Sequence, residues 1–290
     1  MALQARAGSP PTLLLDCGFD LADTALGARA YAQGHLPGAW YADLEQALSG
    51  DKVASKAASN SGNNGRHPLP ERSTLATRVG AWGITPSAQV VCYDDHGGVY
   101  AARAWWLLRW LGHDAAAVLD GGRAAWRAAG GIFDTALPSA PAAPPYPTLP
   151  AAMPTVDAST LGQQLGQPHG NEPGRQLDRI TLIDARAPER FRGEVEPLDP
   201  VAGHIPGAVN RFFKDNLGAD GRFKPAATLR AEFEALGAVQ PAAVVHQCGS
   251  GVTACHNLLA MVHAGIGAGA LYPGSWSEWC SDASRPVAKG

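Results

Sequence analysis

Short apolar runs alternate along the chain with longer stretches of helical composition. Residues 12–16 and 90–93 are rich in Leu and Val and are typical of buried strands. Residues 25–32, 71–82 and 101–111 have the composition of helices, the last of them apolar and rich in tryptophan. Strands that alternate with helices indicate a parallel α/β architecture. We therefore expect an α/β fold.

The second half of the chain repeats the pattern of the first half. The hexapeptide Gly-His-Leu-Pro-Gly-Ala returns as Gly-His-Ile-Pro-Gly-Ala, and the other shared segments follow in the same order. A period of this length indicates duplicated domains and not a solenoid. The matching segments are 14–16 with 182–184, 34–39 with 203–208, 90–94 with 244–248, 119–122 with 272–275, and Trp126 with Trp279.

A proline-rich stretch separates the two halves. Residues 136–154 contain seven prolines, which cannot continue a helix or a central strand. Such a composition is typical of an extended and fairly stiff linker. We expect an N-terminal domain at 1–135, a linker at 136–154 and a C-terminal domain at 155–290.

One stretch of the C-terminal half carries the strongest chemical signal. The apolar run 244–247 leads into Cys248, and Gly249-Ser250-Gly251 precedes a helical stretch that begins at Thr253. The N–H groups of a short glycine-rich loop can form an anion-binding nest, to which a helix N-terminus adds partial positive charge. A cysteine held there should favour the nucleophilic thiolate. The alternative is a buried structural cysteine, against which the two glycines argue.

The loop Cys-Gly-Ser-Gly-Val-Thr-Ala resembles the active-site loop of the rhodanese superfamily of sulfurtransferases, in the variant associated with 3-mercaptopyruvate sulfurtransferases. Together with the duplicated hexapeptide and Pro-Gly-Ser-Trp-Ser-Glu-Trp at 273–279, the resemblance covers nearly the whole chain. It implies two tandem rhodanese-like domains, each a small parallel sheet flanked by helices. Asp94 stands at the position equivalent to Cys248. Because a carboxylate cannot accept a sulfur atom, we expect the first domain to be catalytically silent.

The resemblance implies that Cys248 is the nucleophile. Its thiolate would take the outer sulfur of a small anionic donor, and the persulfide would pass that sulfur to a thiol, cyanide or protein-thiol acceptor. Backbone N–H groups of the loop, from Gly249 and Gly251 through Val252 and Thr253, would stabilise the negative charge. The resemblance favours 3-mercaptopyruvate as the donor, with thiosulfate as the close alternative.

Two arginines are candidate binding residues for an anionic donor. Arg190 matches the arginine that holds the donor carboxylate in mercaptopyruvate enzymes, and the alternative is a surface ion pair. Arg186 is the second candidate, although we expect it to pair with Asp184. The mercaptopyruvate enzymes carry another arginine shortly before the second hexapeptide, where residues 194–200 of this chain contain none. The sequence therefore leaves the carboxylate clamp incomplete.

A proton relay is implied by the same resemblance. In mercaptopyruvate enzymes, a serine at the position of Ser250 works with a histidine and an acid of the first domain. His67 matches the histidine, and Asp43 or Glu45 is the candidate acid. The alternative for His67 is an exposed loop histidine.

Other classes of protein remain to be weighed. A sulfur carrier or redox sensor with little small-molecule turnover is one alternative, and Cys255 could then act as a resolving thiol if it is not simply packed in its helix. A cysteine phosphatase is disfavoured, because the six residues after Cys248 include no arginine to clamp phosphate.

Composition argues against several other classes of protein. A net charge of −3 and a pI near 6.3 give no sign of a nucleic-acid or membrane surface. No apolar run approaches the ~18 residues of a spanning helix, and residues 1–10 lack a signal-peptide pattern. The five cysteines are scattered and form no C-x-x-C motif, which fits a reducing cytoplasm. We expect a cytoplasmic protein without metal or organic cofactor.

Overall fold

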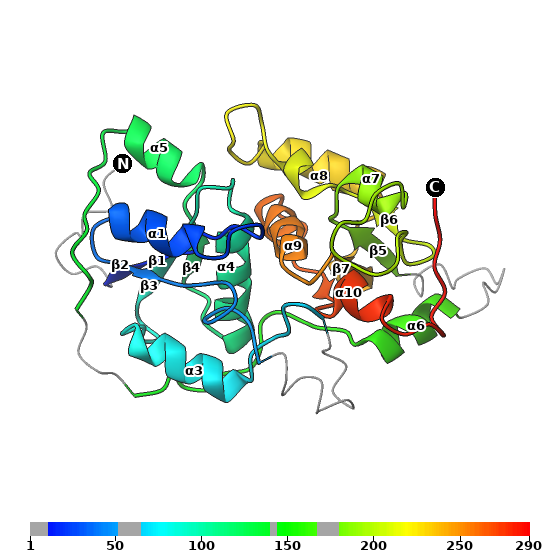
Figure 1. Ribbon diagram of the computed structural model, residues 1–290, viewed down its shortest axis with the longest axis horizontal. Coiled ribbons are helices and arrows are strands. Elements are labelled where there is room, and N and C mark those ends of the chain that lie inside the picture. Colours follow the sequence, from blue (N-terminus) through cyan, green and yellow to red (C-terminus); the bar gives the residue numbers. More distant parts are fainter. Residues whose placement is uncertain (1–10, 52–64, 140–143, 167–179) are drawn as a thin grey trace. The chain divides into compact units, whose positions relative to one another are not determined.

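The computed structural model describes residues 11–51, 65–139, 144–166 and 180–290. Contacts between Cα atoms divide the chain into two compact units (Figure 1). The first unit comprises Met1–Gly50, Pro70–Ala152 and Ala219–Arg222, and the second comprises Asp51–Leu69, Met153–Gly218 and Phe223–Gly290. The segment that ends at Leu69 precedes most of the first unit in sequence, yet it belongs to the second.

The first unit is built on a parallel sheet of four strands in the order β2-β1-β3-β4. Its strands are β1 (Thr12–Asp16), β2 (Ala39–Tyr41), β3 (Gln89–Tyr93) and β4 (Ala116–Val118). The helices are α1 (Leu26–Gln33), α3 (Arg72–Ala81), α4 (Val99–Leu111) and α5 (Gly122–Ala128). Helix α4 is apolar on nearly every face and is accordingly buried along most of its length.

The second unit repeats this plan, with a parallel sheet in the order β6-β5-β7-β8. Its strands are β5 (Thr181–Asp184), β6 (Val209–Asn210), β7 (Val244–Gln247) and β8 (Ala270–Leu271). Its helices are α6 (Ala158–Gly166), α7 (Pro188–Phe191), α8 (Ala226–Ala235), α9 (Thr253–His263) and α10 (Ser275–Trp279), with 3-10 turns at Phe213–Asn216 and Pro241–Ala243. The predicted α/β fold of two repeated parallel sheets flanked by helices is confirmed.

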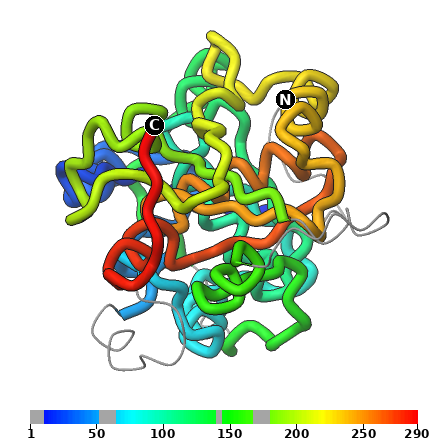
Figure 2. The backbone as a smooth tube through the Cα atoms, turned by 90° about the vertical axis from the view of Figure 1, so that its right-hand side faces the viewer, coloured from blue at the N-terminus to red at the C-terminus, as the bar shows by residue number. Residues whose placement is uncertain are grey.

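The repeated hexapeptides have the same packing in both units. The ring of His35 stacks on Tyr31 and hydrogen-bonds the Tyr31 carbonyl, with Nδ1 and O 2.9 Å apart. In the same way, the ring of His204 stacks on Phe191 and hydrogen-bonds the Phe191 carbonyl, with Nδ1 and O 2.8 Å apart. Beyond it, Ala288 pairs with His204, so the C-terminal residues return to this turn (Figure 2). The shared packing supports a structural role for both histidines.

The end of the proline-rich stretch is held against the first unit. Tyr146 is buried, its N–H donates to the carbonyl of Ala76, and its hydroxyl lies 3.0 Å from Nδ1 of His113. Arg72 also donates to the carbonyl of Leu149. This part of the linker is therefore tethered and does not act only as a spacer. Among the described helices, none combines the length and the hydropathy that crossing a membrane requires.

Candidate active site

Cys248 lies at the carboxyl end of β7, the strand between β5 and β8. The thiol is buried, and the N–H of Gly251 donates to its sulfur with N and Sγ 3.1 Å apart. Gly251 has φ +76°, and a Cβ there would lie 2.6 Å from the carbonyl oxygen of Pro273. Only glycine fits this turn without strain. The amide donor stabilises negative charge on the sulfur.

The first residues of helix α10 hydrogen-bond the backbone of the cysteine loop. The N–H groups of Trp276 and Ser277 donate to the carbonyls of Cys248 and Gly249, at 2.9 and 3.0 Å. The hydroxyl of Ser275 accepts the N–H of Cys248 at 3.1 Å. Both the amide and the carbonyl of the nucleophile residue are thereby bound, which holds the thiol in one position.

The first unit shows what a loop of this length can bind. Asp94 follows β3 and precedes α4 by five residues, just as Cys248 follows β7 and precedes α9. The Asp94 carboxylate is buried and accepts four backbone hydrogen bonds of 2.8 to 2.9 Å. The donors are the amides of His96, Gly98, Tyr100 and Ala101. The loop of the first unit is thus an anion nest that an aspartate of the chain itself fills.

Arg186 is part of the scaffold beneath the site. The expected ion pair with Asp184 is present, with Nη2 and Oδ2 2.7 Å apart, and both side chains are almost fully buried. Each of the three guanidinium nitrogens has an acceptor, and the group lies over the ring of Trp276. These contacts engage every nitrogen of an almost fully buried guanidinium, which favours a scaffold role for Arg186 over substrate binding.

Arg190 lies closer to the nucleophile loop. Its Nε and Nη2 donate to Glu196, the latter at 2.6 Å, and Nη2 also reaches Asp199. A Cβ on Gly249 would lie 3.6 Å from Nη1 of Arg190. Only 17% of the Arg190 side chain is exposed. The guanidinium is therefore held beside the residue that follows Cys248.

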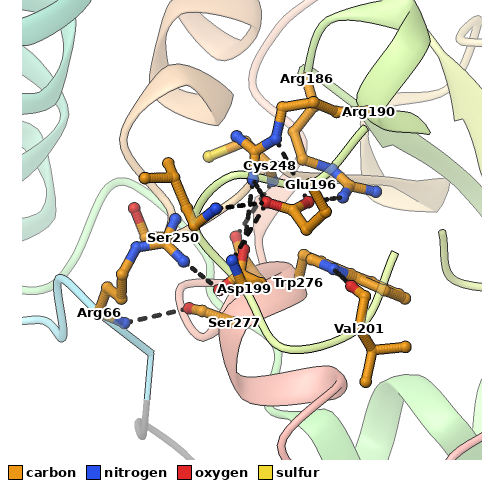
Figure 3. Close-up of polar contacts among 12 residues, drawn as sticks. Arg66, Arg186, Arg190, Glu196, Asp199, Val201, Cys248, Ser250, Trp276 and Ser277 are labelled. Carbon is orange, nitrogen blue, oxygen red and sulfur yellow. Dashed lines mark hydrogen bonds and ion pairs between the residues drawn. The ribbon is translucent and has the colours of Figure 1, made fainter. Parts of the chain in front are cut away.

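Sequence reasoning did not single out Arg66, Glu196 or Asp199, which complete this cluster (Figure 3). The guanidinium of Arg66 is paired with Asp199, and its backbone N–H donates to the hydroxyl of Ser277. Burial raises the pKa of Asp199, although Arg66 and Arg190 act in the opposite direction. The one local signal for Arg66 was its place next to His67.

The structure brings two of the predicted relay residues together. Nδ1 of His67 and Oγ of Ser250 are hydrogen-bonded at 2.7 Å, and both side chains are buried. His67 is therefore not an exposed loop histidine. Asp43 belongs to the first unit, where its carboxylate accepts the N–H groups of Glu45 and Gln46. A role for Asp43 or Glu45 in the relay stays a prediction.

The other four cysteines are also free and buried. The thiol of Cys255 donates to the carbonyl of Gly251 at 3.3 Å from within α9. Burial raises the pKa values of Cys17 and Cys280, which keeps these thiols protonated. These contacts favour a packed helix residue over a resolving thiol for Cys255. Among the described residues, no group of three or more His, Cys, Asp and Glu side chains could hold a metal ion.

Comparison with known proteins identifies similar chains along nearly the whole length. The family described as Rhodanese-like domain matches residues 2–129 and 171–282. A Pseudomonas aeruginosa protein named as a probable 3-mercaptopyruvate sulfurtransferase is 51% identical over 99% of this chain and 96% of its own. Thiosulfate sulfurtransferase of Bos taurus is 33% identical over 96% of this chain and 89% of its own. The structure of 3-mercaptopyruvate sulfurtransferase from Leishmania major matches with a TM-score of 0.75 and 30% identity, covering 97% of this chain and 72% of that one.

Proposed function

Since this chain belongs to the rhodanese family and is a sulfurtransferase, we propose that it transfers sulfur from 3-mercaptopyruvate through a persulfide on Cys248. One arrangement carries the proposal. A buried thiol that accepts an amide hydrogen bond is followed directly by Gly249, against which the guanidinium of Arg190 packs. A nucleophile and a cation for a carboxylate donor are thus neighbours. The 51% identical relative bears the name of this activity.

The first half-reaction forms the persulfide. The thiolate of Cys248 attacks the sulfur of the donor, a sulfur–sulfur bond forms, and the carbon–sulfur bond of the donor breaks. The electron pair of that bond leaves with the carbon, which gives the enolate of pyruvate. A proton then converts the enolate to pyruvate. The N–H of Gly251 stabilises the charge on the cysteine sulfur before the attack.

The hydrogen-bonded pair of His67 and Ser250 is suited to that proton transfer. The Ser250 hydroxyl lies on the cysteine loop, two residues after Cys248. The imidazole of His67, which is hydrogen-bonded to this hydroxyl, can supply the proton through Oγ. The pair is buried, so bulk water does not compete for the same hydrogen bond.

The second half-reaction releases the sulfur. An acceptor thiolate attacks the outer sulfur of the persulfide, the sulfur–sulfur bond breaks, and its electron pair returns to Cys248 as thiolate. Cyanide can replace the thiol and leaves as thiocyanate. Each cycle therefore regenerates the starting enzyme without an external oxidant or reductant.

The test compares initial rates of sulfur transfer from 3-mercaptopyruvate and from thiosulfate, for the wild type and Cys248→Ser. We expect the wild type to prefer 3-mercaptopyruvate and to gain the mass of one sulfur atom on Cys248 when no acceptor is present. Cys248→Ser should transfer none, whereas Cys255→Ser should keep the activity. Transfer by Cys248→Ser at the wild-type rate would overturn the mechanism.

Thiosulfate is the second candidate donor, because thiosulfate sulfurtransferases are also relatives over nearly the full chain. A preference for thiosulfate in the same assay would select it. Transfer that occurs only to one protein acceptor, with no turnover on a free thiol, would instead indicate a sulfur carrier.

A further inference from the structure

Ser277 of α10 contacts two segments that lie far apart in the sequence. Its backbone N–H donates to the carbonyl of Gly249, the residue after the nucleophile, at 3.0 Å. Its hydroxyl accepts the backbone N–H of Arg66, with N and Oγ 3.1 Å apart (Figure 3). Both segments belong to the second unit. One residue therefore binds the cysteine loop and the segment of residues 65–67 together.

The segment of residues 65–67 also approaches α10 closely at a second point. A Cβ on Gly65 would lie 2.6 Å from the carbonyl oxygen of Gly274 and 3.1 Å from its Cα. The Ser277 hydroxyl donates to the same Gly274 carbonyl at 3.2 Å while it accepts the N–H of Arg66. The hydroxyl thus uses its one donor and an acceptor position at once, which fixes where its oxygen lies. The backbone of this segment is held against the beginning of α10 at two adjacent points.

His67 is the last residue of the same segment. Its Nδ1 lies 2.7 Å from Oγ of Ser250, and both side chains are buried. Ser250 belongs to the cysteine loop, whose Gly249 carbonyl accepts the N–H of Ser277. Helix α10 is therefore the common support of the imidazole and the hydroxyl. The bond between them tolerates little displacement, because hydrogen bonds weaken steeply as their geometry departs from the ideal.

We propose that Ser277 is a positioning residue for the proton relay, because its hydroxyl sets the place of His67 relative to Ser250. This role rests on the function proposed above. The relay serves the step in which the enolate of pyruvate takes up a proton. Thiosulfate, in contrast, leaves sulfite, a stable anion that needs no proton for its release. A displaced His67 should therefore slow the reaction of 3-mercaptopyruvate and spare that of thiosulfate.

The experiment measures pyruvate release in a single turnover without acceptor, for the wild type, Ser277→Ala and Gly65→Ala. Ser277→Ala removes the acceptor of the Arg66 N–H, and Gly65→Ala pushes residue 65 away from Gly274. We expect each variant to release pyruvate about tenfold more slowly at saturating donor, because a misplaced proton donor loses part of its contribution of about 10²–10⁴-fold. The donor concentration at half-saturation should change less than about twofold, since neither substitution removes a charged group. Ser277→Thr keeps the hydroxyl and should keep the wild-type rate.

Two further readouts separate positioning from general damage to the cysteine loop. Alkylation of Cys248 by iodoacetamide needs the thiolate and no proton donor, so its rate and pH dependence in Ser277→Ala should match the wild type. In a His67→Gln background, adding Ser277→Ala should slow pyruvate release by less than about twofold, because the residue through which Ser277 acts is gone. The matched control is Ser281→Ala, which removes a hydroxyl bonded to the carbonyl of Glu278 and should leave every rate unchanged.

The outcomes separate the two proposals. If the wild type releases pyruvate and folded Ser277→Ala and Gly65→Ala do so at the same rate, the role of Ser277 is wrong and the proposed function stands. Slower alkylation of Cys248, or an equal loss with thiosulfate as donor, would mean that Ser277 supports the whole loop, and would overturn its role in the relay. A tenfold loss that persists in the His67→Gln background would overturn it as well. If the wild type releases no pyruvate from 3-mercaptopyruvate, the proposed function fails and the role of Ser277 fails with it.

Discussion

Ser275 combines a strained backbone with a hydroxyl that the cysteine loop uses. Its φ of 54° is left-handed and is the one such value among the described non-glycine residues. Its hydroxyl accepts the N–H of Cys248 and donates to the carbonyl of Tyr272. In the first unit the equivalent residue is Gly122, with the same φ of 54°. The second unit therefore carries about 1 kcal/mol of backbone strain at Ser275. The first unit avoids this strain with a glycine, because it has no nucleophile that a hydroxyl would hold in position.

Two substitutions of Ser275 separate these effects. Ser275→Ala keeps the strain and removes both hydrogen bonds, so we expect a loss of about 1–3 kcal/mol in the free energy of unfolding and slower sulfur transfer. Ser275→Gly removes the same bonds but relieves the strain. It should be more stable than Ser275→Ala in urea unfolding and equally slow in transfer.

The control for this pair is Ser281→Ala, which removes a hydroxyl bonded to the carbonyl of Glu278, away from Cys248. It should keep the wild-type transfer rate. If Ser275→Gly transfers sulfur as fast as the wild type, the hydroxyl does not position the nucleophile.

At the scale of the element, β7 is a central strand that is buried along its whole length. His246 lies within it, with Nε2 2.9 Å from the sulfur of Met261 on α9. Burial lowers the pKa of His246 to about 3. The imidazole is therefore neutral in the folded protein, whereas an unfolded histidine takes up a proton below about pH 6.5.

This difference predicts a loss of stability in acid. Between pH 6.5 and 3 the unfolded state binds one more proton at His246 than the folded state, so the free energy of unfolding falls as the pH falls. The slope from this one group approaches about 1.4 kcal/mol per pH unit. His246→Gln should show a shallower slope than the wild type in urea unfolding measured from pH 7 to 4.5.

His263→Gln is the matched control, because it removes an exposed histidine at the end of α9. Equal slopes for the wild type and His246→Gln would show that burial of His246 does not drive the acid response.

The elements differ in how far the sequence predicts them. Strands β1 and β7 and helix α9 follow from local apolar runs, and the structure confirms all three. Strand β2 begins at Ala39, the last residue of its hexapeptide, and β6 begins directly after its own. They span three and two residues, and the sequence indicated only a turn there. Such short strands show no alternation of polar and apolar residues, and pairing with β1 or β5 defines them.

The site was predictable only where its residues belong to a local motif or, as with His67, match a residue of the resembled family. Cys248 and Ser250 lie in one loop, and Arg190 follows β5 in a stretch that resembles a known pattern. Arg66 is separated from Asp199 by 133 positions and from Ser277 by 211. No periodicity or spacing in the sequence links residues so far apart, and folding alone brings them together.

At the scale of the whole molecule, duplication produced two similar loops with different surroundings. Both follow the third strand of their sheet, and the loop of the first unit binds the carboxylate of Asp94 through four amides. Counted from the aspartate that ends the first strand, Gly18 and Ala22 stand where the second unit has Arg186 and Arg190. Around Asp94, then, the anion nest is present but the arginines are replaced.

This comparison predicts that an anion nest with a cysteine is insufficient for sulfur transfer. The variant Asp94→Cys, made in Cys248→Ser, places a thiol in the nest of the first unit. We expect no persulfide at residue 94 by intact mass after incubation with 3-mercaptopyruvate, and no turnover with a thiol acceptor. The donor would find neither the arginine pair beside Gly249 nor the hydroxyl of Ser250.

Asp94→Ser in Cys248→Ser controls for the loss of the buried carboxylate, and circular dichroism should show that both double variants are folded. Sulfur added at residue 94 would mean that the nest activates a thiol without nearby arginines. The first unit would then be silent only because Asp94 replaces a cysteine. Without such addition, a thiol in an anion nest needs the arginines or the Ser250 hydroxyl that surround Cys248, and one substitution cannot convert the first unit into a second active site.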